Sequence, residues 1–116
     1  MKYILVFMVS FFFNQNMYAD ELSVGVYKIA QASTCGLYTE KKMAVYKSYD
    51  NIDYHMHKFK LYGSYEMKKL IELGYNKNEI LKLVVKKIDY VNENMKNYSW
   101  RVSKRYEKFC MPIVEN

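Results

Sequence analysis

The residues with the most obvious capacity for chemistry are two histidines and the acids around them. His55 and His57 are the only histidines, and a spacing of two on a helix points them in different directions. Asp50, Asp53 and His57 follow at spacings of three and four and would share one helix face. They could bind a metal ion or make His57 a pH-sensitive ion pair. A solvated polar face fits them better, because three ligands from one helix without a fourth make a poor site, so we expect no metal.

The remaining polar residues show no catalytic arrangement. The sequence has no GxSxG or HExxH motif, no glycine-rich loop for phosphate, and no plausibly spaced set of serine, histidine and aspartate. Several glutamates are scattered along the chain and are interpreted as surface charges: Glu66, Glu72, Glu79, Glu93 and Glu107. We therefore expect no enzyme and no cofactor. An enzyme acting on cell-wall polymer would need an acid–base pair that nothing in the spacing selects.

Aromatic and basic residues together are the most unusual feature of the chain. Of 116 residues 13 are tyrosine, and 18 Lys and Arg against 12 Asp and Glu give a net charge of +6. Near the C-terminus basic residues surround the single tryptophan and predict a partner-binding surface: Trp100, Arg101, Lys104, Arg105 and Lys108. Tryptophan, tyrosine and arginine are enriched at protein–protein hot spots. The alternative is that tyrosine rings fill the core while lysines keep the protein soluble.

The N-terminal residues predict export. Lys2 is the only charged residue among the first nineteen, and an apolar run extends from Tyr3 to Phe13. This run is shorter than the roughly 20 apolar residues that a membrane span needs. The layout is typical of a secretory signal peptide over residues 1–19, cleaved after Ala19 and followed by a single domain over residues 20–116. An uncleaved N-terminal anchor is the alternative.

Export changes the interpretation of the two cysteines, Cys35 and Cys110. In an oxidising compartment they are expected to form a structural disulfide. The competing interpretations are a nucleophilic thiol and a metal ligand. Neither is favoured, because the sequence has no CxxC motif and no histidine close to either cysteine.

Hydrophobic spacing predicts that these residues are positioned by helices. The only proline is Pro112, so long helices are permitted before it. Steps of three and four place apolar residues on one face in two segments: Val45, Tyr49, Ile52, Met56 and Phe59, and Ile88, Val91, Met95, Tyr98 and Val102. Val84 and Phe109 extend the second stripe. The sequence predicts an all-α bundle of about four helices around an antiparallel hairpin, with one disulfide.

Glycines and capping residues set the expected helix boundaries. Four helices are expected: Asp20 to Gly36, Thr39 to about Tyr62, Ser64 to Leu73, and Asn76 to about Cys110. A bent continuation past Gly36 and a bend within Asn92–Asn97 are open alternatives. If the second and fourth helices are antiparallel, the disulfide would join the start of one to the end of the other.

One segment, Leu70–Val84, has the helix–glycine–aromatic–cap–helix form of small DNA-binding and ubiquitin-binding modules. Export makes both functions improbable, so we expect no nucleic acid as a partner. The favoured interpretation is a turn between two helices in which Tyr75 packs against the helix that follows.

The first functional hypothesis is a small periplasmic or secreted binding protein, such as an immunity protein or an inhibitor of lysis or wall enzymes. It would block a protein partner with an acidic surface, and peripheral contact with an anionic membrane or cell-wall polymer is an open alternative. The second hypothesis is an acid-stress chaperone, suggested by His57 between acids and by the methionine-containing stripe. The oligomeric state does not follow from the sequence.

Overall fold

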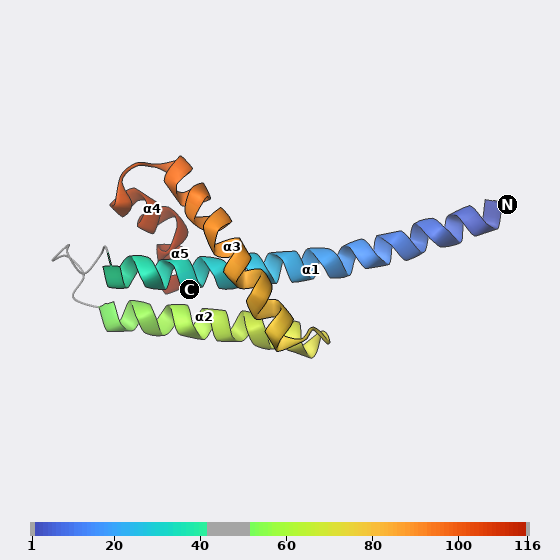
Figure 1. Ribbon diagram of the computed structural model, residues 1–116, viewed down its shortest axis with the longest axis horizontal. Coiled ribbons are helices and arrows are strands. Elements are labelled where there is room, and N and C mark those ends of the chain that lie inside the picture. The colour runs from blue at the N-terminus through green and yellow to red at the C-terminus, as the bar shows by residue number, and fades with distance from the viewer. Residues whose placement is uncertain (1, 42–51, 116) are drawn as a thin grey trace.

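The chain is all α-helical over the residues that the structure describes (Figure 1). This computed structural model describes residues 2–41 and 52–115, with side chains at 21–40 and 52–115. Its helices are α1 (Lys2–Lys41), α2 (Ile52–Glu72), α3 (Lys77–Tyr98), α4 (Val102–Phe109) and α5 (Met111–Val114). The predicted all-α bundle is confirmed. None of the described helices has both the length and the apolar character of a membrane span.

α1 and α2 lie side by side and antiparallel, and the N-terminal half of α1 projects beyond the other helices (Figure 1). Buried apolar residues join the two helices: Val26, Ile29, Ala30 and Ala32 from α1, and Phe59 and Leu70 from α2. Burial of each large apolar side chain contributes about 1.5–3 kcal/mol. This packing makes the α1–α2 pair the base on which the C-terminal helices lie.

The helix ends expected at Gly36 and Gly63 are wrong, because α1 and α2 continue through these positions. From Ile52 onward the expected second helix is continuous with the expected third helix as α2, and residues 42–51 of the expected second helix lie outside the described residues. Thr39 lies within α1 instead of capping a new helix. A glycine in a helix costs about 1 kcal/mol relative to alanine. Tertiary packing outweighs that cost here, because both glycines line the contact between the two helices.

The turn between α2 and α3 follows the prediction closely. Gly74 has a φ of +102°, a conformation that glycine adopts without strain. The N–H of Tyr75 donates to the Leu70 carbonyl at 3.1 Å, and the N–H of Gly74 donates to Ile71 at 3.0 Å, which together form a Schellman motif. Asn76 then caps α3 by accepting hydrogen bonds from two backbone N–H groups. Tyr75 is half-buried and packs against the core.

α3 crosses over α1 (Figure 1) and buries one face against it through Ile80, Val84, Val91 and Met95. The expectation of one helix to about Cys110 is wrong, because α3 ends at Tyr98. Ser99 has extended φ and ψ angles of −160° and 144°, so the chain reverses just after the asparagine-rich stretch. The two short helices α4 and α5 then return to the α1–α2 pair.

The predicted disulfide between Cys35 and Cys110 is confirmed, and both residues are fully buried. The helices that it joins differ from those expected. Cys35 lies inside α1 instead of before a second helix, and Cys110 lies between α4 and α5. The disulfide therefore ties the C-terminal helices to the middle of the described α1–α2 packing.

Reduction of this disulfide is expected to lower the free energy of unfolding by about 4 kcal/mol, because it closes a loop with a sequence separation of 75. Urea unfolding of the oxidised protein, the reduced protein and the Cys35→Ala/Cys110→Ala variant measures this loss. Equal midpoints for the oxidised and reduced proteins would contradict the prediction.

Alanine substitutions at Gly25 and Gly36 are expected to have opposite effects on stability. A Cβ at Gly25 would lie 2.8 Å from Cδ1 of Leu70, which is only 2% exposed, so overpacking should cost about 1–3 kcal/mol. A Cβ at Gly36 would lie 3.7 Å from the Met56 side chain, and Gly36→Ala should gain about 0.5–1 kcal/mol in helix propensity. Thermal unfolding compares the two variants, and equal melting temperatures would contradict the close packing at Gly25.

Candidate functional site

The candidate site is a surface on the turn between α3 and α4 and on the outer face of α4. We call it the basic–aromatic tip and define it as Tyr98, Trp100, Arg101, Lys104 and Lys108. All five residues are exposed. Trp100 is 79% exposed, the highest value among the large hydrophobic side chains of the described residues.

Trp100 is held on a short, ordered turn instead of on a helix face. Ser99 ends α3, and its hydroxyl accepts a hydrogen bond from the Arg101 N–H at 3.1 Å. Trp100 lies before α4, so the spacing of four between Trp100, Lys104 and Lys108 does not place all three on one helix face, although all three are exposed. A fixed turn presents the indole with little loss of freedom on binding.

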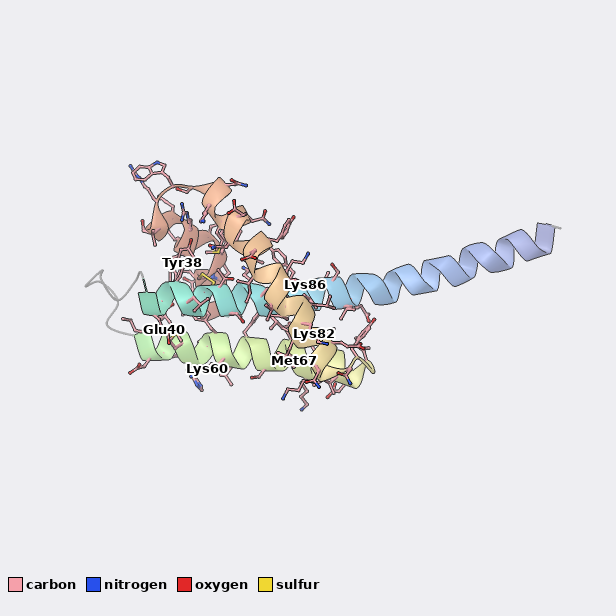
Figure 2. All side chains as sticks on the ribbon, viewed as in Figure 1. Tyr38, Glu40, Lys60, Met67, Lys82 and Lys86 are labelled. Carbon is pink, nitrogen blue, oxygen red and sulfur yellow. A yellow bond between two sulfur atoms is a disulfide. The ribbon has the colours of Figure 1, made fainter. Side chains whose placement is uncertain are left out.

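Arg105 differs from the other predicted partner-binding residues, because it is half-buried and bonds within the protein. Its Nε donates to the Ser99 carbonyl, and its Nη1 donates to the Tyr38 hydroxyl at 3.1 Å. Tyr38 lies on the side of α1 toward α4 (Figure 2). The Arg105 guanidinium thus links the turn to α1 and positions the tip.

Cation–π contacts connect the basic and aromatic residues of the tip. The Arg101 guanidinium lies 5.2 Å from the Trp100 ring, and the Lys108 ammonium lies 5.8 Å from the Tyr98 ring. Tyr98 also packs edge-on against Phe109 at 5.6 Å. Lys104 forms an exposed ion pair with Glu107 at 3.8 Å, and such pairs are weak. Positive charge is therefore held beside exposed aromatic rings.

The opposite face of α4 is anchored in the core through Tyr106, which is fully buried. Its ring stacks on His55 at 5.8 Å and meets Phe59 edge-on at 6.2 Å. The Gln31 side chain donates a 2.6 Å hydrogen bond to the Phe109 carbonyl at the end of the helix. These contacts fix α4 against both α1 and α2.

Hydrogen bonds connect the Tyr106 hydroxyl to both base helices. It lies 2.6 Å from His55 Nδ1 and 3.2 Å from the Thr39 hydroxyl, which is 2.9 Å from the Cys35 carbonyl. The Thr39 hydroxyl must donate to that carbonyl, because a carbonyl only accepts. Tyr106 then donates to Thr39, and His55 Nδ1–H donates to Tyr106. Only this set of donors and acceptors supplies one proton to each of the three hydrogen bonds, Thr39 to Cys35, Tyr106 to Thr39, and His55 to Tyr106.

The hypotheses drawn from the sequence concern His57 and assign no role to His55. His55 is buried, whereas His57 is exposed. Burial lowers the pKa of His55 below its ordinary value of 6.5. The sequence feature that could have predicted the burial of His55 is its spacing of four from Phe59, which puts the two residues on one helix face.

The polar set around His57 does not form a site in the described part of the chain. Asp53 and His57 are both exposed, and Asp50 lies outside the described residues. Among the residues that the structure describes, no group of three potential ligands could hold a metal ion.

Comparisons of this chain with known protein families, curated proteins and solved structures found no match.

The lowered pKa of His55 makes stability depend on pH in a defined direction. The unfolded chain binds a proton at His55 near pH 6.5, and the folded protein does so only at lower pH. The contribution of neutral His55 to stability should therefore be complete above about pH 6.5 and be lost as pH falls through the lowered pKa. Urea unfolding between pH 8 and pH 5 measures this loss.

Two matched variants separate His55 from the carboxylates that also titrate in acid. His55→Gln should reduce the dependence of the unfolding midpoint on pH, while His57→Gln at the exposed position should leave it as in the wild type. Identical pH profiles for all three proteins would contradict the assignment to His55.

Proposed function

We propose that this chain is an exported binding protein whose basic–aromatic tip blocks an acidic surface on a protein partner. The observation that carries the proposal is Trp100, which is 79% exposed on a fixed turn and is stacked by Arg101. Tryptophan and arginine are the side chains that dominate binding energy when a partner buries them. Lys104 and Lys108 add positive charge that would steer an acidic partner and select its orientation.

Export is part of the proposal and is supported by two features. Residues 1–19 have the composition of a secretory signal peptide. The buried Cys35–Cys110 disulfide is of a kind that persists mainly in oxidising compartments, such as the periplasm or the outside of the cell. An immunity protein or an inhibitor of a wall-active enzyme would work in such a compartment.

Reversal of charge at the tip should abolish capture of the partner. Immobilised oxidised protein is exposed to an envelope extract, and the bound proteins are compared for wild type, Trp100→Ala and Lys104→Glu/Lys108→Glu. Loss of a hot-spot tryptophan typically costs 2 kcal/mol or more, about a thirtyfold loss of affinity. Both variants should lose the captured protein while their circular dichroism stays unchanged.

The matched control is Lys82→Glu/Lys86→Glu, with the same charge change and the same spacing on the exposed surface of α3 (Figure 2). It should capture the partner as the wild type does. Equal losses for the two double variants would contradict the tip assignment. Binding to anionic vesicles or wall polymer that needs Trp100, without any captured protein, would favour peripheral attachment to the envelope instead.

A second candidate function, an acid-stress chaperone, is favoured by one observation. His55 is buried against Tyr106, the residue that holds α4 in the core. Burial disfavours the protonated form of His55, so protonation would destabilise this packing. Acid would then loosen α4 and expose apolar helix faces for a client protein. Near-UV circular dichroism between pH 7 and pH 3 tests this function, since a tertiary signal that persists throughout would exclude it.

A further inference from the structure

A groove of about 830 Å³ runs along the α1–α2 pair and takes no part in the basic–aromatic tip. α1 and α2 supply its lining, together with Lys77 at the start of α3. Its floor consists of buried apolar residues and of positions with little or no side chain: Ile29, Ala32, Phe59, Gly36 and Gly63. A floor of this kind lets the backbone of another segment approach closely.

The sides of the groove are apolar and partly exposed. Leu37 is 44% exposed and Ile71 is 43% exposed, and half-buried Met56 and Met67 lie between them along the groove. Exposed apolar side chains that line one groove and are bordered by polar residues are typical of an interaction site. Methionine is flexible and polarisable, and it recurs on surfaces that accept apolar helices. The shape and chemistry match the groove that an amphipathic helix fills.

The exposed edge of the groove on α2 is basic over two helical turns. Lys60, Ser64 and Lys68 follow at spacings of four and form the exposed edge on α2. Among the described residues, no carboxylate is ion-paired with Lys60 or Lys68, although Glu66 is paired with Lys28 and Lys69. Two carboxylates also line the groove, Glu40 near the end of α1 and Glu72 at the end of α2, and Figure 2 places Glu40, Lys60 and Met67 along the two helices.

The geometry points to a second binding surface, a groove that accepts an amphipathic helix of a protein partner. The apolar face of that helix would cover Leu37 and Ile71, and acidic residues along one flank would pair with Lys60 and Lys68. Two acids two turns apart would match this lysine spacing. A second copy of this chain fits less well, because a chain of net charge +6 would bring like charges together.

The test uses a dye-labelled synthetic peptide of 18 residues with leucines at helical spacings and glutamates along one flank. Fluorescence anisotropy measures its binding to the oxidised protein at moderate salt. Lys60→Glu/Lys68→Glu should weaken binding about tenfold or more, because two ion pairs are lost and two like-charge contacts replace them. Lys82→Glu/Lys86→Glu on α3 should change it less than about twofold.

A variant that blocks the groove and a peptide of opposite charge complete the test. Ser64→Trp should block the groove at an exposed position and abolish binding without loss of helical circular dichroism. A peptide with lysines in place of the glutamates should bind at least about tenfold more weakly. Failure of the glutamate peptide to bind, or equal effects of the two double variants, would overturn the inference.

A concentration-dependent dimer in sedimentation that Ser64→Trp dissociates would assign the groove to a second copy and would also overturn the inference. The tip variants Trp100→Ala and Lys104→Glu/Lys108→Glu should bind the peptide as the wild type does. Loss of peptide binding at the groove and loss of partner capture by the basic–aromatic tip are therefore measured separately.

Discussion

The position of α4 depends on one buried junction, formed by the Cys35–Cys110 disulfide and the Tyr106 side chain. α4 has eight residues and α5 has four, and helices this short are not stable alone in water. The disulfide holds the end of α4 against α1, and the Tyr106 ring and hydroxyl bind both α1 and α2. Without this junction, α4 and the turn that carries exposed Trp100 would not be held against α1 and α2.

The buried and exposed faces of α4 carry different kinds of residue, and only the exposed face belongs to the proposed binding surface. Tyr106 and Cys110 point into the core, and half-buried Arg105 bonds to the turn and to α1. Lys104 and Lys108 lie on the exposed side and make only weak surface contacts. A partner could therefore take up these lysines without disturbing the contacts that hold the helix in place.

The layering of the helices explains why apolar surface stays open elsewhere. α3 packs mainly on α1 and only slightly on α2, so the groove beside Leu37 and Ile71 is not covered by the described helices. The glycines at 36 and 63 bring α1 and α2 close and deepen this groove. A third element of suitable chemistry could complete the packing there, which is the basis of the second binding surface.

Three features could be predicted from the sequence alone: the helical class, the Cys35–Cys110 disulfide, and the turn at Gly74 and Asn76. The helical class and the turn depend on local spacing and backbone conformation, and the disulfide was predicted from the expected export of a chain with two cysteines. Only tertiary structure decided that helices continue through Gly36 and Gly63, since packing between α1 and α2 outweighs the cost of glycine. It also decided that His55 rather than His57 is buried and that Arg105 turns inward, because the break at Ser99 folds α4 back onto α1. The spacing of apolar residues along one helix does not predict which of its faces a segment distant in the sequence will cover.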